Sequence, residues 1–238
     1  MIRASSDRKT QAYPAQRNTF GTLPGLPGEG GTCPGATTGA GGCSHVWKGR
    51  KTKVCYVDKL IRAYKGVKGV LQHNTEELTK ATHDEKVALF ITEFLRFYDE
   101  EKRREKSDAF WYRLHWSGDV PDEEYAWALK EAMEACPFIK FWGYTRSLFS
   151  VPILAGTKNL RWYISADATN VEESWELYQK YLMDPEVNNI HFCYLGKERP
   201  KELKLATCPV DAGRLDLEGG CHKCQLCFKG ARIFFPEK

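Results

Sequence analysis

Apolar residues in the second half of the chain alternate between the spacing of strands and the spacing of helices. Short apolar runs at 110–116, 139–144, 160–164 and 190–195 are typical of buried strands, and 204–207 is a possible fifth strand. Segments 122–136 and 171–183, which lie between strands, carry apolar residues at helical spacing. Strands that alternate with helices indicate βαβ units. The pattern therefore predicts an α/β fold built as a parallel βα array, either an open sheet or part of a TIM-like barrel.

From Val57 onward, the first half of the chain is predicted to be helical. Apolar residues from Val57 to Tyr64 recur at helical spacing, and Gly66 and Gly69 are expected to end this helix. A longer helix is predicted over 83–105, where the apolar residues form a broad stripe.

Residues 1–32 are polar and then rich in glycine and proline, a composition that favours an extended or mobile arm. The chain has 238 residues, of which 42% are hydrophobic and 13% aromatic, so it is long enough to bury a sizeable core. We therefore expect a flexible arm over 1–32 and a single α/β domain over 33–238, with cysteine-rich segments at 33–56 and 208–228.

Charge and hydropathy restrict the partners and the location of the protein. Lys and Arg number 35 and Asp and Glu 31, and this small excess neither repels nucleic acid nor predicts that the chain binds it. No apolar run approaches the roughly 20 residues of a membrane span, and the N-terminus lacks the apolar core of a signal peptide. We expect a cytoplasmic protein without a membrane partner. In that reducing compartment, nine cysteines favour metal or redox chemistry over disulfides, although Cys136 and Cys193 have apolar neighbours and are expected in the core.

The strongest candidate for chemistry is a group of cysteines near the end of the sequence. Cys208 is followed by Cys221, Cys224 and Cys227, and two-residue spacers turn the chain back so that neighbouring sulfurs face one centre. We interpret the group as a four-thiolate site. Zinc usually takes two separated Cys-x-x-Cys pairs, whereas an unbroken Cys-x-x-Cys-x-x-Cys with one remote cysteine beside a proline favours a [4Fe–4S] cluster. Zinc remains the alternative.

A second group of cysteines lies between the arm and the first helix. Cys33, Cys43 and Cys55 are separated by nine and eleven residues in a region with little predicted structure. Thiols in such a region suggest a centre that orders the loop when it is ligated, but loose spacing is also common by chance. His45 is a possible fourth ligand, and a histidine in a polar loop is more often simply solvated.

Polar residues follow three successive predicted strands, and in parallel sheets the carboxyl ends of strands form the site. They are Ser117, Gly118 and Asp119, then Thr145 and Arg146, then Ser165 and Asp167. The same residue types also build ordinary turns. His115 lies within the first of these strands. It is either a core or surface histidine, or it faces a pocket where an imidazole could ligate or exchange protons.

Several of these stretches resemble, in their order, the phage gene-product-88 family. The matching stretches are Cys33-Pro34-Gly35-Ala36 with Cys55-Tyr56, the run from Arg113 to Asp119, Tyr144-Thr145-Arg146-Ser147, and Cys208-Pro209 with Cys221-His222-Lys223-Cys224-Gln225-Leu226-Cys227. The likeness covers the chain from about Phe20, although Cys43 and Cys55 stand further apart than in the family pattern. It implies a phage origin, hence a host cytoplasm, and an α/β body with cysteine clusters, without an activity.

A more distant likeness is to radical-SAM enzymes, which combine N-terminal cysteines, a parallel βα array and an auxiliary cluster. It implies a catalytic [4Fe–4S] cluster on three N-terminal thiolates, with one iron open to S-adenosylmethionine, and a closed cluster on the C-terminal four. The compact Cys-x-x-x-Cys-x-x-Cys of those enzymes is absent. On this hypothesis the cofactor contacts Ser117, Gly118 and Asp119, and the catalytic residues are His115, Ser117, Asp119, Arg146 and Asp167.

The alternative hypothesis is a metal-stapled module, with zinc or an iron–sulfur centre, that binds nucleic acid or a host protein without catalysis. The basic segment 48–53 and the many aromatic residues suit single strands, since cations and stacking rings bind them. A hydrolase is disfavoured because no Ser-His-Asp elbow, phosphate-binding Gly-Lys loop or His-Glu-x-x-His helix occurs. Whether the protein is an enzyme acting on a small molecule stays open at this point.

Overall fold

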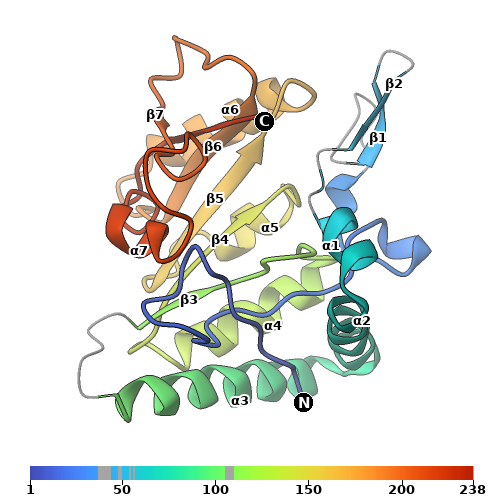
Figure 1. The fold of residues 1–238 in the computed structure, drawn as a ribbon. Coiled ribbons are helices and arrows are strands. Elements are labelled where there is room, and N and C mark those ends of the chain that lie inside the picture. Colours follow the sequence, from blue (N-terminus) through green and yellow to red (C-terminus); the bar gives the residue numbers. More distant parts are fainter. Residues whose placement is uncertain (37–43, 48–49, 54, 56, 105–109, 238) are drawn as a thin grey trace.

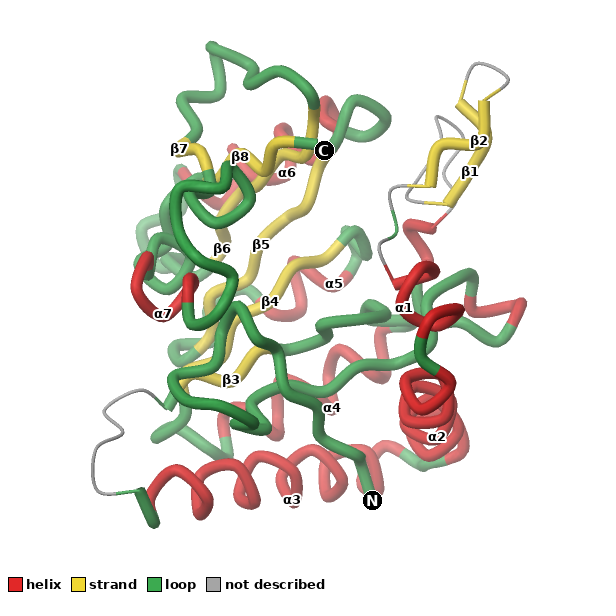
Figure 2. The backbone as a smooth tube through the Cα atoms, viewed as in Figure 1, coloured by secondary structure: helices red, strands yellow, loops and turns green. Residues whose placement is uncertain are grey.

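A six-stranded sheet forms the centre of the computed structural model, which describes residues 1–36, 44–47, 50–53, 55, 57–104 and 110–237 (Figure 1). The strand order is β3-β4-β5-β6-β8-β7, and all neighbours are parallel. The strands are β3 (Trp111–Arg113), β4 (Lys140–Thr145), β5 (Leu160–Ala166), β6 (Ile190–Gly196), β7 (Ala206–Thr207) and β8 (Ile233–Pro236). The sheet is open and curls into a half-barrel (Figure 2), which confirms the predicted α/β fold with a parallel βα array.

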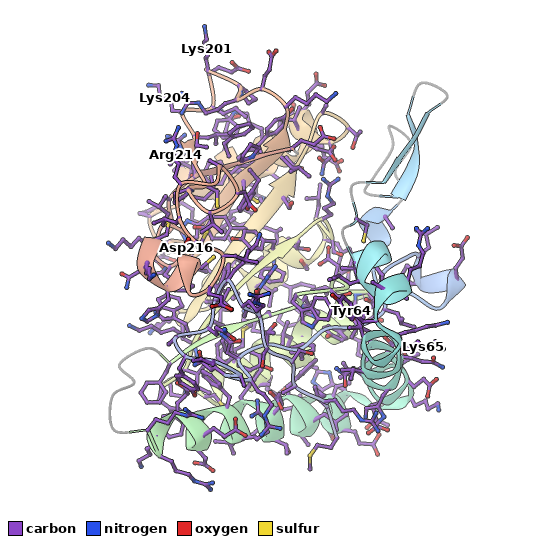
Figure 3. The ribbon with its side chains drawn as sticks, in the orientation of Figure 1. Tyr64, Lys65, Lys201, Lys204, Arg214 and Asp216 are labelled. Carbon is purple, nitrogen blue, oxygen red and sulfur yellow. The ribbon has the colours of Figure 1, made fainter. Side chains whose placement is uncertain are left out.

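Both faces of the sheet are covered, as parallel sheets require, and side chains fill the space between layers (Figure 3). Because side chains alternate along a strand, Tyr112, Phe141 and Trp162 lie on one face, buried with apolar residues of the long helices. We call this the outer face. Tyr163 and Cys193 lie on the opposite, inner face, where they pack against the segment that carries the C-terminal cysteines. The inner face is therefore where the C-terminal cysteines lie.

The described helices are α1 (Val57–Ala63), α2 (Lys65–Lys80), α3 (His83–Lys102), α4 (Glu123–Glu134), α5 (Ser150–Leu154), α6 (Val171–Leu182) and α7 (Gly220–Cys224). Of these helices, α1, α3, α4 and α6 follow the predicted pattern, whereas α2, α5 and α7 were not predicted. The predicted helix at 83–105 begins as expected, with a capping box in which Thr82 and Glu85 bind each other's backbone N–H. Gly66 and Gly69 do not end a helix and lie inside α2 instead. Nothing lies within 4 Å of a Cβ added at either glycine, and the helix is held by its buried residues further on, including Leu71 and Leu78.

The remaining described elements are short. An antiparallel pair, β1 (Ser44–Trp47) and β2 (Arg50–Lys53), precedes α1, and 3₁₀ turns occur at Pro27–Glu29 and Pro34–Ala36. None of the described helices is long and apolar enough to cross a membrane. Cys136 and Cys193 are both 1% exposed, which confirms that they are core residues.

Part of the N-terminal segment lies beside β3 as an additional extended strand. Thr19 forms a parallel bridge with Arg113, the Arg113 N–H donates to the Asn18 carbonyl at 2.9 Å, and the Trp116 N–H donates to the Phe20 carbonyl at 3.0 Å. Residues 1–32 were predicted as an extended or mobile arm; residues 18–20 of this segment pair with the edge of the half-barrel, and the mobility of the arm stays a prediction. The edge contact leads the chain directly from the sheet into the loop of Cys33.

Candidate functional site

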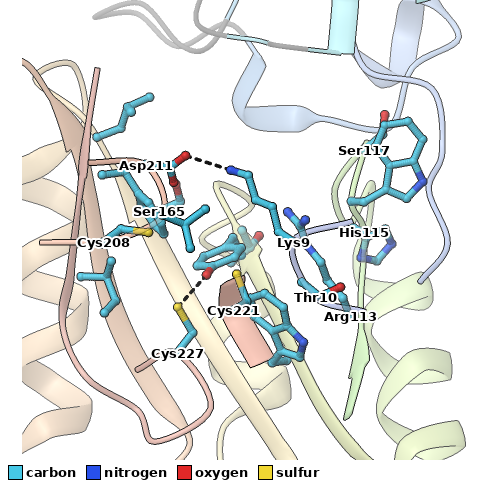
Figure 4. A pocket seen from close by; sticks show the side chains of 18 of the residues that line it. Lys9, Thr10, Arg113, His115, Ser117, Ser165, Cys208, Asp211, Cys221 and Cys227 are labelled. Carbon is cyan, nitrogen blue, oxygen red and sulfur yellow. Dashed lines mark hydrogen bonds and ion pairs between the residues drawn. The ribbon is translucent and has the colours of Figure 1, made fainter. Parts of the chain in front are cut away.

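A cavity of about 610 Å³ opens on the inner face of the half-barrel and extends to the carboxyl ends of its strands (Figure 4). Its lining brings together residues from both ends of the sequence. Among the predicted site residues, it contains Cys33, Cys55, His115, Ser117, Gly118, Asp119, Arg146, Cys208, Cys221, Cys224 and Cys227. In Figure 4, Cys208 and Cys227 lie on one side of the cavity and His115 and Ser117 on the other. Both predicted cysteine groups therefore contribute to one cavity.

The C-terminal thiols are positioned by the sheet and by the short helix α7. Cys208 follows β7 directly, and its N–H donates to the carbonyl of Phe234 in β8 at 2.8 Å. Cys221 and Cys224 belong to α7, and Cys227 lies in the turn after it. The hydroxyl of Tyr144 donates to Cys227 Sγ at 3.0 Å (dashed in Figure 4), so a strand residue fixes the position of this sulfur.

Burial dominates the electrostatics of these thiols. Burial, and then the charge of Cys227, raise the pKa of Cys221 to about 12. Burial likewise raises the pKa of Cys227 to about 12; the hydrogen bond from Tyr144 opposes the rise, and the charges of Cys193, Cys208 and Cys224 add to it. The C-terminal thiols and the core residue Cys193 therefore lie near one another. Cys221 and Cys227 are neutral thiols at physiological pH, and a bound metal would deprotonate them by its own charge.

The N-terminal segment and β3 each place a cation beside the C-terminal thiols. The Lys9 ammonium pairs with Asp211 at 2.9 Å, and the N–H of Cys221 donates to the Lys9 carbonyl at 2.8 Å. Arg113, from β3, forms an ion pair with Asp7, and its charge lowers the pKa of Cys221 against the larger effect of burial. Two cations thus flank Cys221, where they would stabilise thiolates and a negatively charged centre.

Among the described residues, no three His, Cys, Asp or Glu side chains are grouped so that they could hold one metal ion. The four-thiolate site predicted at Cys208, Cys221, Cys224 and Cys227, and the choice between zinc and a [4Fe–4S] cluster, therefore stay predictions.

The N-terminal cysteine loop lies against the ends of β3 and β4. The Cys33 N–H donates to the Gly25 carbonyl at 2.7 Å, and a Cβ added to Gly35 would lie 2.6 Å from the Cβ of Arg146. Cys33 is buried and Cys55 half-buried. Cys43 and the side chain of His45 lie outside the described residues, so the convergence of three N-terminal thiols stays a prediction.

The Ser117-Gly118-Asp119 turn packs directly on the arm that leads to Cys33. Gly118 has φ of +80°, and a Cβ there would lie 1.9 Å from Thr22 Oγ1 and 2.5 Å from Thr32 Oγ1. Only glycine combines this backbone conformation with so close an approach. The turn is thereby held next to the residue that precedes Cys33.

Asp119 connects the carboxyl ends of two strands. Its carboxylate is 6% exposed and accepts hydrogen bonds from the Thr145 hydroxyl and the Arg146 N–H, both at 2.7 Å, and from the Val120 N–H at 2.8 Å. Burial raises the pKa of Asp119, and these hydrogen bonds oppose the rise. Asp119 thus fixes the shape of the turn through these hydrogen bonds.

Arg146 and Asp167 form an ion pair of 2.6 Å at the ends of β4 and β5. Burial opposes ionisation of Asp167, but Arg146 and hydrogen bonds from Thr169 hold the pKa of Asp167 below its ordinary value. Arg146 lines the cavity and Asp167 does not. The role of Asp167 that follows from this geometry is to orient Arg146.

His115 lies in a left-handed backbone conformation, with φ of +50°. Its Nε2 is 2.6 Å from the Tyr125 hydroxyl, and its ring packs edge-on against Phe20 at 4.8 Å between centroids. Burial lowers the pKa of His115 to about 3, so the imidazole is neutral at physiological pH. A neutral ring packed among aromatic residues is unsuited to be a general acid. A catalytic role of His115 stays a prediction.

Three residues beside the C-terminal thiols were not identified from the sequence as site residues: Tyr144, which donates to Cys227 Sγ, Arg113, whose charge acts on Cys221, and Lys9, whose carbonyl accepts from the Cys221 N–H. Lys9 has no local signal, because it reaches Asp211 from 202 positions away in the sequence. Arg113 and Tyr144 lie on the inner face of their strands, and the alternation of side chains along β3 and β4 could have indicated this.

Comparisons with known proteins point to one family. The sequence model of the family described as gene product 88 matches residues 2–230. The Gene 88 protein of Mycobacterium phage L5 is 30% identical, with 97% of this chain and 95% of that protein covered. The Gene 88 protein of Mycobacterium phage D29 is 28% identical over the same shares of the two chains. No solved structure matches. Both relatives are phage proteins, in agreement with the phage origin that the resemblance implied.

Proposed function

This chain belongs to the gene product 88 family. From the residues that line its cavity, we propose that it is a radical-SAM-like iron–sulfur enzyme. The observation that carries the proposal is the single cavity lined by thiols from both ends of the chain. Cys208, Cys221, Cys224 and Cys227 would hold an auxiliary [4Fe–4S] cluster. Cys33, Cys43 and Cys55 would hold the catalytic one.

The order of elements around the cavity supports this proposal. The edge segment beside β3 leads into the cysteine loop, the chain then passes through α1 to α3, and it returns through β3 to the Ser117-Gly118-Asp119 turn. The turn contacts the residues just before Cys33 through Thr22 and Thr32. A ligand bound to the N-terminal centre would therefore lie against this turn, where radical-SAM enzymes carry the loop that contacts S-adenosylmethionine.

The chain's own residues have distinct parts in this mechanism. Cys33, Cys43 and Cys55 would hold a cluster with one iron left open, and this would supply a binding position for S-adenosylmethionine and the electron for its reductive cleavage. Ser117 and the backbone of Gly118 would contact that cofactor, and Asp119 holds the turn in shape. Arg146, oriented by Asp167, supplies a fixed cation for a carboxylate. The aromatic residues Trp142 and Phe228 line the cavity and limit the access of water.

Anaerobic purification and reconstitution with iron and sulfide test the proposal. Two [4Fe–4S] centres predict about eight irons and eight sulfides per chain, with broad visible absorption. Addition of S-adenosylmethionine should change the EPR spectrum of the reduced protein, because it binds one iron directly. A colourless protein that retains only zinc would overturn the proposal.

The second candidate is a metal-stapled module that binds nucleic acid or a host protein without catalysis. It is favoured by the hydrogen bonds and ion pairs with which the N-terminal segment and the C-terminal cysteine loop hold each other, as in a structural staple. The basic segment 48–53 that suggested nucleic acid lies partly outside the described residues. Zinc content together with salt-sensitive binding of DNA or RNA would favour this candidate.

A further inference from the structure

A second cavity, of about 530 Å³, lies at the amino ends of β3, β4 and β5, at the opposite end of these strands from Cys33 and the Ser117-Gly118-Asp119 turn. Its lining consists of Trp111, Glu134, Pro137, Lys140, Gly156, Lys158, Asn159 and Arg161. Trp111 and Lys140 are the first residues of their strands and are paired in register. We call this the cationic pocket. It shares none of its lining residues with the thiol-lined cavity.

The cationic pocket contains more positive than negative charge. Lys140, Lys158 and Arg161 face it together with the single acid Glu134, so the formal charge of the lining is 3 − 1 = +2. Within the described part of the chain, none of the three cations forms an ion pair. Arg161 donates a hydrogen bond to the carbonyl of Leu160 at 3.2 Å, and the Lys140 ammonium lies 5.5 Å from the centre of the Trp111 ring. Like charges gathered in a concave site raise the local potential, so the site favours an anionic ligand.

The effect of Arg161 on a buried neighbour agrees with an unbalanced charge. The pKa of His191 is lowered to about 4, first by burial and then by the positive charge of Arg161. An acid paired with Arg161 would cancel most of this second effect. The guanidinium therefore acts on its surroundings as a net cation.

The scaffold around these cations is rigid. The side-chain amide of Asn159 donates to three carbonyls, those of Met133, Cys136 and Ile139, at 2.8 to 3.1 Å, which ties β5 to the end of α4. Trp111 stacks on Phe228 with ring centroids 4.4 Å apart and an angle of 11° between the planes. The backbone that carries the cations is thus held in place, which lowers the entropic cost of arranging them around a ligand.

We propose that the cationic pocket binds a phosphate group, carried either by a free nucleotide or by the backbone of single-stranded nucleic acid. A guanidinium and two ammonium groups match the several oxygens and the double charge of phosphate better than the single charge of a carboxylate. The proposal does not depend on bound iron. It adds a second binding site at the far end of the half-barrel.

Binding of pyrophosphate, measured by calorimetry, and of a fluorescent single-stranded oligonucleotide, measured by anisotropy, tests the proposal on the full-length protein. The triple variant Lys140→Gln, Lys158→Gln, Arg161→Gln should weaken binding by roughly tenfold or more, because it removes the charge-assisted hydrogen bonds. For the oligonucleotide, the slope of log K against log salt should shrink by about 2, as expected for three lost contacts to single-stranded phosphates. Glu134→Gln, which removes the acid, should tighten binding.

The matched control removes the same charges elsewhere: Lys65→Gln, Lys201→Gln, Arg214→Gln, three exposed residues that project from the surface in Figure 3. It should bind both probes nearly as tightly as the unmodified protein. Pyrophosphate binding without oligonucleotide binding supports the proposal with a free nucleotide as the source, and binding of both supports it with nucleic acid as the source. No binding of either probe at low salt, or equal weakening in the two triple variants with native circular dichroism, overturns it.

Discussion

The hydroxyl of Tyr144 lies 3.0 Å from the sulfur of Cys227 and donates a hydrogen bond to it. Hydrogen bonds to cysteine sulfurs withdraw charge from an iron–sulfur cluster and raise its reduction potential. Tyr144→Phe should therefore lower the potential of the C-terminal centre by an amount on the order of tens of millivolts, measured by a redox titration followed by EPR.

Tyr163→Phe is the matched control for this prediction. Its hydroxyl donates to the backbone carbonyls of Cys227 and Ala231, at 2.9 and 3.1 Å, and not to a sulfur. The potential should change less in this variant, although the protein loses stability. Equal potentials in Tyr144→Phe and the unmodified protein would show that the sulfur of Cys227 is not a ligand of the centre.

Replacement of one C-terminal thiol tests the cluster assignment directly. Cys224→Ser should lower the iron content after reconstitution from about eight to about four per chain, because a cluster with a missing ligand is lost more readily. Cys193→Ala is the control, since Cys193 is a core residue of β6 and lies outside the cavity lining. Iron contents that fall equally in both variants would contradict the assignment.

Gly118→Ala tests the packing of the turn on the arm. The added Cβ would meet Thr22 Oγ1 at 1.9 Å in a backbone conformation of φ +80°, so the free energy of unfolding should decrease by about 2–4 kcal/mol. Gly213→Ala has a similar φ of +70° with nothing within 4 Å of its Cβ, and it should cost only about 1 kcal/mol. Urea unfolding of both variants gives the comparison, and equal losses would mean that close packing at Gly118 contributes nothing.

Buried His115 should make stability depend on pH. Its folded pKa of about 3 lies below the ordinary 6.5, so between these values the unfolded state binds the proton. The contribution of His115 is therefore complete above pH 6.5 and is lost as the pH falls toward 3. His115→Asn, which tolerates the left-handed backbone, should flatten the decrease in unfolding free energy between pH 6.5 and about 5. A parallel decrease in both proteins would contradict this.

Asp167→Asn tests the buried ion pair with Arg146. Loss of one partner leaves a buried charge uncompensated, so the free energy of unfolding near neutral pH should fall by about 3 kcal/mol. The folded pKa of Asp167 is lowered, so the stability that the pair provides is present above the ordinary value of 3.8 and is lost as the pH falls below it. Urea unfolding in neutral buffer and near pH 3.5 should give a difference between the two proteins that shrinks in acid.

The fold could be predicted where local pattern and tertiary structure agree. The strands at 139–144, 160–164 and 190–195 are apolar runs buried on both faces, and the parallel array follows from the helices between them. α2 was not predicted because Gly66 and Gly69 weaken a helix that tertiary contacts then support. β8 was missed because it is short, and its position between β6 and β7 requires a crossover that no local pattern reveals.

The residues of the candidate site could likewise be predicted only where the signal is local in the sequence. Cysteine spacing indicated thiols that line the cavity, and polar strand ends indicated Asp119 and Arg146, which line it too, because both signals are local in sequence. The contacts of Lys9 and Tyr144 were missed, because each joins segments that are far apart in the chain. Predictions from periodicity do not report which distant segments meet.

The contacts between the N-terminal segment and the C-terminal cysteine loop have a consequence for folding kinetics. Arg8 reaches Glu218 across 210 positions, and the carbonyls of Arg8 and Lys9 accept hydrogen bonds from Gly219 and Cys221. Contacts of such long sequence separation form late, since the intervening chain must first lose its conformational entropy. The C-terminal side of the thiol-lined cavity should therefore form after the half-barrel has assembled, which leaves an interval in which a ligand can still enter the cavity.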